Sequence, residues 1–435
     1  MRPIIAVLTI LAVFLSGEAR AKVYIDLSAP SVQKIPIAIQ EFKDLESTMP
    51  AETVKSVREE LMDTLKSDLA FSGFFKVVDK AAYIEPPTAG LAENETNFKD
   101  WRDSGADTLI KAGFTAGKDR LTVEARFFDC FKEKQIVGKK YIGNPDNPRR
   151  LMHYFADQLY EELTGRKGVF TSRILFVSAR SGNKEVYLSD YDGKNTVRIT
   201  RNGSINLSPQ WSPDGRKILY ISYKKGSPAL YMLDLKTGED RAVSNKPGIN
   251  IAGRFSPDGN RIALTLSGSK SPELHIIDLR TGEDRQMTDN FGIDVSPAWS
   301  PDGKSIAYVS DTSGNPHIFM IDLATAKGKR LTYDGKYNSS PAWSPDGKLI
   351  AFSRSDSGKF NIWVMRPDGG GATQLTFSGN NRSPSWSPDG RHIIFSSSSG
   401  GSSSLYIMNS DGTGARKVTT GAGNETSPSW SPYLQ

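Results

Sequence analysis

The stretch Trp211-Ser212-Pro213-Asp214-Gly215 decides the fold, because it recurs through the second part of the chain. The further copies begin at Phe255, Trp299, Trp343, Trp386 and Trp430, the last of them shortened to Trp430-Ser431-Pro432. Their aromatic residues lie 44, 44, 44, 43 and 44 residues apart. A repeat of this period with tight turns is typical of propeller blades, which have four short strands each.

Other features keep the same register. An apolar segment follows each Pro-Asp-Gly turn, the first at 218–220, and a matching segment at 174–176 has no such turn before it. A third strand carries an aromatic residue or His275, and a fourth ends in pairs such as Ile199-Thr200. Proline fixes φ in the turn and Asp-Gly accepts left-handed backbone. We expect the Trp or Phe before each turn to fill the wedge between neighbouring blades.

The first copy of the repeat lacks the Trp-bearing strand, and an extra one, 426–432, follows the last full copy. The sequence therefore predicts a six-bladed β-propeller of WD40-like repeats over 172–435. In this propeller the C-terminal strand completes the first blade. Such closure removes the open sheet edge that invites aggregation.

Residues 22–165 predict a small N-terminal α/β domain, joined to the propeller by a linker at 166–171. Val54, Val57, Leu61 and Leu65 lie at helical spacing, and apolar residues alternate with polar ones from Leu121 to Phe127. We expect strands near 36–39, 75–78 and 108–112. A last helix should begin at Asn147-Pro148 and stop at Gly165.

The first 21 residues predict a signal peptide. Arg2 is followed by an apolar run at 4–15, too short to span a membrane comfortably, and then by the cleavage pattern Ala19-Arg20-Ala21. Cleavage after Ala21 would leave a soluble exported protein with no transmembrane segment.

Composition and motifs give no indication of catalysis. No nucleophile, metal or phosphate-binding motif is present, so no catalytic residue, metal or cofactor is expected. The net charge of +6 is spread thinly, which disfavours nucleic-acid binding. The single Cys130 lies among phenylalanines as a small buried hydrophobe. His275 replaces the aromatic residue of the third strand and is expected to pack. His317 and His392 lie at positions that vary between repeats, and we expect that of His392 to be at the surface. His153 lies on the last helix of the first domain.

The loops before the Trp-bearing strands are the expected partner-binding rim of the propeller, since variable loops on a rigid scaffold often carry recognition. Five residues before each aromatic lies a polar residue: Asn206, Asn250, Asp294, Asn338, Asn381 and Glu425. These side chains either ring a mouth of the channel, where they would hold a peptide or a cation, or cap turns through Asx-type hydrogen bonds. Both readings stay open at this point.

The start of the mature chain is a second candidate for partner binding. In Lys22-Val23-Tyr24-Ile25-Asp26 the residues alternate as in a strand, which suits addition to the sheet edge of a partner. An edge strand of the first domain is the alternative.

Taken together, the chain resembles the TolB family, the periplasmic component of the Tol–Pal system of Gram-negative bacteria. The resemblance rests on the signal peptide, the α/β domain, the W-S-P-D-G blades, the junction from Gly168 to Ile174, Ser189 to Gly193, and the ending Ser429 to Leu434. It departs from the family in the second repeat, 249–255, where Ser-Pro before the aromatic residue is missing.

The resemblance implies a monomeric, non-catalytic periplasmic scaffold that supports outer-membrane integrity and cell division. It would bind the lipoprotein Pal through a propeller face and TolA through the mature N-terminus. The alternative is a hydrolase-like or peptidase-like propeller protein that lost or never had a catalytic domain.

Overall fold

The computed structural model describes residues 34–268 and 271–434. The predicted signal peptide and the N-terminal segment Lys22 to Asp26 lie outside the described residues. Contacts divide the chain into two compact units, Met1–Pro148 with Gln158–Arg166, and Arg149–Asp157 with Lys167–Gln435. Helix α3 (Pro148–Thr164) contributes residues to both units.

The first unit is built on a mixed sheet of six strands in the order β3-β1-β4-β5-β6, with β2 paired to β4. The two pairs made by β1 are parallel, whereas β4, β5 and β6 pair antiparallel. The strands are β1 (Ile35–Ile39), β2 (Lys43–Asp44), β3 (Phe75–Val77), β4 (Thr108–Ala116), β5 (Leu121–Asp129) and β6 (Lys134–Gly143). The helices are α1 (Ala51–Ser72), α2 (Phe98–Asp103) and the short η1 (Lys80–Ala82) and η2 (Glu93–Glu95).

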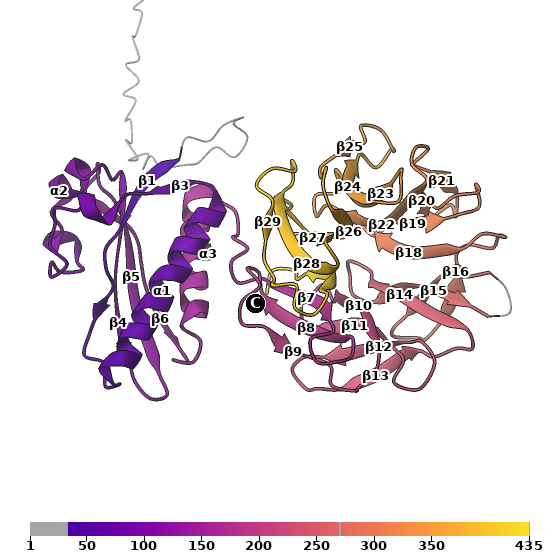
Figure 1. Cartoon of the computed structure of the whole chain (residues 1–435), viewed down its shortest axis with the longest axis horizontal. Coiled ribbons are helices and arrows are strands. Elements are labelled where there is room, and N and C mark those ends of the chain that lie inside the picture. The colour runs from indigo at the N-terminus through magenta and orange to yellow at the C-terminus, as the bar shows by residue number, and fades with distance from the viewer. Residues whose placement is uncertain (1–33, 269–270, 435) are drawn as a thin grey trace, which may run out of the picture. The chain divides into compact units, whose positions relative to one another are not determined.

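Helix α1 packs against β3 and β4 (Figure 1). Its buried residues include Val54, Val57 and Leu61, the stripe that the sequence predicted. It ends at Gly73, whose φ of 76° is the left-handed conformation that glycine adopts at helix ends. The predicted strands and the α3 helix are present, whereas β6 and α2 were not predicted.

The second unit is a propeller of six four-stranded antiparallel sheets, as predicted (Figure 1). Five blades are consecutive in the chain: β10 (Asn206–Trp211), β11 (Lys217–Ser222), β12 (Ala229–Asp234), β13 (Asp240–Ser244); β14 (Ile249–Phe255), β15 (Arg261–Ser267), β16 (Glu273–Asp278), β17 (Asp284–Gln286); β18 (Asp294–Trp299), β19 (Ser305–Ser310), β20 (His317–Asp322), β21 (Gly328–Arg330); β22 (Tyr337–Trp343), β23 (Ile350–Ser355), β24 (Phe360–Met365), β25 (Thr373–Gln374); β26 (Asn380–Trp386), β27 (His392–Ser399), β28 (Ser402–Asn409), β29 (Arg416–Lys417).

The first blade is completed by the end of the chain. Its sheet has the order β30-β7-β8-β9, with β30 (Thr426–Trp430), β7 (Arg173–Ser178), β8 (Glu185–Asp190) and β9 (Val197–Arg198). Strand β30 pairs antiparallel with β7 and contacts the innermost strands on both sides, β26 and β10. The ring is therefore closed by the C-terminal strand, which confirms the prediction.

The repeated tryptophans lie between blades. Trp211, for example, joins a cluster with Leu175 and Val186 of the first blade and Tyr220 of its own. The indole N–H of Trp211, Trp299, Trp343 and Trp386 donates to a main-chain carbonyl of the preceding blade at 3.0–3.1 Å. Trp430 instead donates to the Ser172 hydroxyl at 2.8 Å. The aromatic residues thus fill the wedges between blades, and four of the tryptophans also bond the preceding blade.

Candidate functional site

The propeller has two faces, because each innermost strand runs from a loop at one side of the ring to a Ser-Pro turn at the other. The rim loops, which form the rim face and include the first residue of β14, β22 and β26, are 201–205, 245–249, 289–293, 333–337, 377–380 and 420–424. The turn face carries the Ser-Pro turns that begin at Ser212, Ser256, Ser300, Ser344, Ser387 and Ser431.

All six polar residues predicted at the rim are buried in the structure. Their exposed fraction is at most 2%, and this holds for Asn206, Asn250, Asp294, Asn338, Asn381 and Glu425. The expectation that these side chains line the channel mouth is therefore wrong. The inner channel is lined two positions further on, by Ser208, Ala252, Ser296, Ser340, Ser383 and Ser427.

A bulge in the innermost strand explains the difference. The register of β10 against β11 shifts between Leu207 and Gln210, and Ser208 has a φ of 50°. All six channel positions adopt positive φ values between 50° and 60°. Because bulges re-aim side chains, the residues before the bulge point into the blade and those at the bulge point into the channel.

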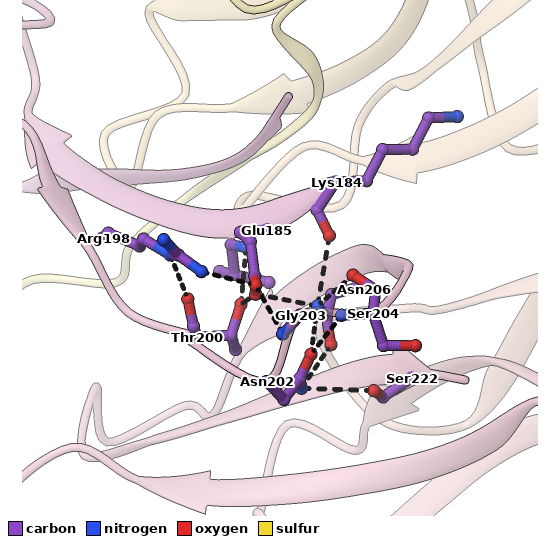
Figure 2. A network of polar contacts seen from close by, with 10 residues as sticks. Lys184, Glu185, Arg198, Thr200, Asn202, Gly203, Ser204, Asn206 and Ser222 are labelled. Atoms are coloured by element: carbon purple, nitrogen blue, oxygen red, sulfur yellow. Dashed lines mark hydrogen bonds and ion pairs between the residues drawn. The ribbon is translucent and has the colours of Figure 1, made fainter. Parts of the chain in front are cut away.

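Asn206 shows what the rim residues do instead (Figure 2). Its side-chain amide donates to the carboxylate of Glu185 at 2.8 Å, to the Ser204 carbonyl at 3.0 Å and to the Lys184 carbonyl at 3.1 Å. Glu185 is itself fully buried and also accepts from Arg198 and Thr200. A buried polar network with every member bonded holds a loop in one conformation.

The other blades repeat this arrangement with different residues. The rim side chain bonds the main chain of its own loop in four more cases: Asn250 to the Lys246 carbonyl, Asn338 to the Asp334 carbonyl, Asn381 to the Ser378 carbonyl, and Glu425 to the Gly423 N–H. In the remaining blade, Asp294 accepts from the side chain of Asn290 at 2.8 Å. The turn-capping reading is thus the one that the geometry supports.

Asp294 of β18 lies beside a second buried acid, Glu273 of β16 in the preceding blade. Glu273 accepts from the Thr288 hydroxyl at 2.6 Å and from the Asn290 N–H at 2.9 Å. Burial and the neighbouring Asp294 carboxyl raise the pKa of Glu273 above its ordinary value. A basic substitution at Asp294 would therefore disturb a buried network rather than only change a surface charge.

The exposed residues of the rim loops are large and apolar. Within the described part of 172–434, seven large apolar side chains are exposed, and six of them lie on rim loops: Ile205, Phe291, Ile293, Tyr333, Tyr337 and Phe377. Phe291 is fully exposed, Phe377 is 79% exposed and Tyr333 is 70% exposed. Exposed apolar side chains that gather on one face indicate an interaction surface.

Sequence reasoning missed these six residues. Tyr333 and Phe377 directly follow a threonine that lies two residues beyond the end of the fourth strand, and Phe291 lies in the equivalent loop. That position alone does not separate an exposed aromatic residue from a packed one. Tyr337, for example, also packs edge-on against Phe360 at 5.4 Å between ring centroids.

The turn face is regular, as the repeat predicted. In five Ser-Pro-Asp-Gly turns the glycine has a φ between 68° and 74°. The serine hydroxyl donates to the aspartate of the same turn, at 2.5 Å from Ser212 to Asp214. Backbone geometry therefore accounts for the motif.

The cysteine and the histidines take part in packing and hydrogen bonding. Cys130 is buried, and burial raises the pKa of its thiol to about 12, so reactive thiolate is scarce. His275 occupies the aromatic slot and contacts Asp284 at 2.8 Å. His317 is buried against Thr332 and Asn338. In the described parts of the chain, no cluster of His, Cys, Asp or Glu is arranged to hold a metal ion.

His392 corrects a prediction, because it is buried rather than at the surface. Its ring stacks on Trp430 of the closing strand, with 6.3 Å between centroids. Burial lowers the pKa of His392 to about 4, although Asp389 opposes this shift. His153 lies on α3, as expected, and is buried there.

Comparison with known proteins agrees with the repeat. Residues 160–434 match the family model described as the TolB beta propeller domain, and residues 23–136 match the TolB amino-terminal domain. Over the residues that the structure describes, no helix is both long and apolar enough to cross a membrane.

Individual relatives carry the same family name. The chain is 43% identical over 195 residues to the Tol-Pal system protein TolB of Desulfosudis oleivorans, which is 44% of each chain. It is 40% identical over 195 residues to that of Geobacter sulfurreducens, 45% of this chain and 44% of the relative. The matched region thus spans less than half the length of these curated relatives.

The crystal structure of TolB from Acinetobacter baumannii is similar over nearly the whole chain. It superposes with a TM-score of 0.78 at 28% identity, covering 92% of this chain and 97% of that one. Because the TolB propeller model covers more than half of the residues, the chain belongs to the TolB family, whose curated members are named Tol-Pal system proteins.

Proposed function

We propose that the chain is a non-catalytic, periplasmic protein-binding scaffold of the Tol–Pal system that supports outer-membrane integrity and cell division. It binds a Pal-like lipoprotein through the rim face and a TolA-like protein through Lys22 to Asp26. The observation that carries the first part is the set of exposed apolar side chains on the rim loops, with Phe291, Tyr333 and Phe377 the most exposed.

The rim face has the physical character of a binding surface. Aromatic side chains bury much area with little loss of conformational freedom, and tyrosine and tryptophan are frequent among interface hot spots. The loops that bear them are fixed from beneath by buried side chains such as Asn206, Asn338 and Asn381. A pre-organised loop loses less entropy when a partner binds. The six rim residues thus act in partner binding by holding the loops.

The test is a comparison of two triple variants. Phe291→Ser, Tyr333→Ser and Phe377→Ser together remove the three most exposed rim aromatics. The control, Arg216→Ser, Lys304→Ser and Lys348→Ser, shortens three exposed side chains on the turn face. Binding of each protein to purified Pal-like lipoprotein is measured by calorimetry.

We expect the rim variant to bind at least about 100-fold more weakly, because each lost hot spot typically costs 1 kcal/mol or more. The control should bind within about twofold of the unmodified protein. Both should keep their melting temperature, since exposed substitutions change stability by about 0.5 kcal/mol or less. Equal binding of the rim variant and the unmodified protein would overturn the assignment of this face.

The N-terminal segment is tested separately by deleting residues 22–28. This deletion should abolish binding of a TolA-like protein and leave Pal-like binding unchanged. If TolA-like binding survives the deletion, the segment serves another purpose.

A further inference from the structure

A single arginine lies in the central channel of the propeller. Arg254 precedes the aromatic residue of β14, where the repeat has Gln210, Ala298, Ala342, Ser385 and Ser429 in the other blades. It is therefore the one charged residue among the six equivalent positions. This blade is also the one in which the Ser-Pro before the aromatic residue is replaced by Ala252-Gly253.

Arg254 lies where two cavities meet. On the inner side is a channel of about 80 Å³, lined by Ser208, Ser296, Ser340 and the other bulge residues. On the side of the turn face is a wider funnel of about 450 Å³, whose wall contains the repeated tryptophans and prolines. Arg254 and Gln210 line both. Among the described residues, no acidic side chain lines either cavity.

Among the residues that the structure describes, no acidic side chain supplies a counter-charge to the guanidinium of Arg254. Its Nη1 is buried and has no hydrogen-bond partner among the described residues. Burial lowers its pKa to about 10, so the group stays charged at neutral pH. Arg254 as a whole is half-buried, so its charge is partly withdrawn from water without a counter-charge, which costs free energy. A charged group that the fold leaves without a partner is a candidate for function.

We infer that the funnel and channel form a second binding site, which takes the carboxylate of an extended peptide segment of a partner protein. Arginine presents a planar fork of donors that matches a carboxylate, and serine hydroxyls around the channel supply further donors. The channel volume of about 80 Å³ leaves room for a carboxylate group beside Arg254. The site lies on the face opposite the rim loops and does not depend on the Pal proposal.

The funnel favours a peptide over a small acid. Its volume of about 450 Å³ is in the usual range for ligand sites of roughly 300–1,000 Å³. Aromatic walls such as Trp211, Trp299 and Trp386 resemble the grooves in which other domains dock extended peptides. Arg254 would bind the carboxylate at the end of the peptide, and the tryptophan rings of the funnel would pack against the peptide's side chains.

The experiment uses the full chain and a short peptide, acetyl-Ala-Pro-Ala-Pro-Asp, with both carboxylates free. Tryptophan fluorescence reports binding, because five tryptophans line the funnel. Two related peptides separate the sources of the carboxylate: one has an amidated C-terminus, and the other has Asn in place of Asp. Acetate alone tests for a small acid.

We expect saturable binding of the free peptide, and loss of at least tenfold in affinity with Arg254→Gln. The matched control Arg216→Gln, an exposed arginine on the same face, should change affinity by less than twofold. A loss with the amidated peptide alone assigns the chain terminus, and a loss with the Asn peptide alone assigns the side chain. Binding of acetate as tight as that of the peptide, or equal binding by Arg254→Gln, would overturn the proposal.

Stability gives an independent readout. Without ligand, Arg254→Gln should melt at the same temperature as the unmodified protein or higher, because a half-buried charge without a counter-charge is removed. Saturating peptide should raise the melting temperature of the unmodified protein and not that of the variant. A lower melting temperature for Arg254→Gln together with no peptide effect would show a structural arginine and contradict the site.

Discussion

Each innermost strand of the propeller begins at a rim loop and ends at a Ser-Pro turn, and the two ends are stabilised differently. At the turn face, backbone conformation is set by the motif itself, as in Ser212 to Gly215, with the same hydroxyl–carboxylate bond from blade to blade. At the rim face, one buried side chain per blade, such as Asn206 or Glu425, ties the loop to the sheet beneath.

If the rim face binds a partner as we propose, the difference separates the residues needed for folding from those used in recognition. In the Ser-Pro-Asp-Gly turns each residue type is required by the backbone conformation, so few substitutions are compatible with the turn. In a rim loop that one buried residue holds, the other positions can carry exposed side chains such as Phe291 or Phe377. The exposed residues of the rim loops thus differ from blade to blade, whereas the buried position beneath each loop is always Asn, Asp or Glu.

The largest loss of stability should come from removing β30, the C-terminal strand that closes the ring. Deleting 426–435 removes β30, which pairs with β7 and contacts β26 and β10. We expect an open blade and a poorly folded protein. Trp430→Ala alone should cost about 3–5 kcal/mol, because the ring is buried and its N–H bonds Ser172. An unchanged thermal melting curve for the truncated protein would contradict closure by this strand.

A second prediction concerns His392, which packs against Trp430 of the closing strand. Titration of this histidine should make the free energy of unfolding depend on pH. The pKa of His392 in the folded protein is about 4, below its ordinary value of 6.5. The stability contributed by the neutral ring is therefore fully present above pH 6.5 and is lost as pH falls toward 4, on the order of 2–3 kcal/mol. The charged groups around it are Asp389, Arg391 and Arg416.

This pH effect is measured as melting temperature against pH for the unmodified protein and His392→Asn. Carboxylates elsewhere also lose charge in this range, but they do so equally in both proteins. The variant should show the shallower fall between pH 6.5 and 4. Parallel curves would mean that His392 does not titrate as its burial implies.

A smaller effect should come from replacing a buried rim residue such as Asn206. Asn206→Ala should cost about 1–3 kcal/mol, because it leaves the buried Glu185 short of one donor. The control Arg201→Ala, an exposed residue of the same loop, should cost about 0.5 kcal/mol or less. Chemical denaturation of the two variants measures both values, and equal losses would show that the buried anchor has no special role.

The repeat predicted the propeller well, because blade period, turn chemistry and the orphan strand at 426–432 are all local patterns in the chain. It did not predict the direction of the rim side chains. The bulge at Ser208 reverses them, and nothing in Asn206-Leu207-Ser208 indicates positive φ at a serine. Burial of His392 likewise depends on Trp430, which reaches it only once the ring is closed.

The same limit applies to the rest of the candidate site. The exposed Phe291 and the unpaired Arg254 become significant only when burial and neighbours are known. In the sequence, one is an aromatic residue in a polar loop and the other an interruption of the Ser-Pro pattern. Composition indicates neither as a site.

The most direct test of the rim assignment is hydroxyl-radical footprinting of the full chain, alone and in complex with a purified Pal-like lipoprotein. Each aromatic side chain on the rim reports its own accessibility, so one measurement compares both faces. We predict that Phe291, Tyr333 and Phe377 become protected in the complex, whereas Pro213, Pro301 and Pro345 of the turn face keep their reactivity. Protection of the turn-face prolines with no change at the three aromatics would contradict the account.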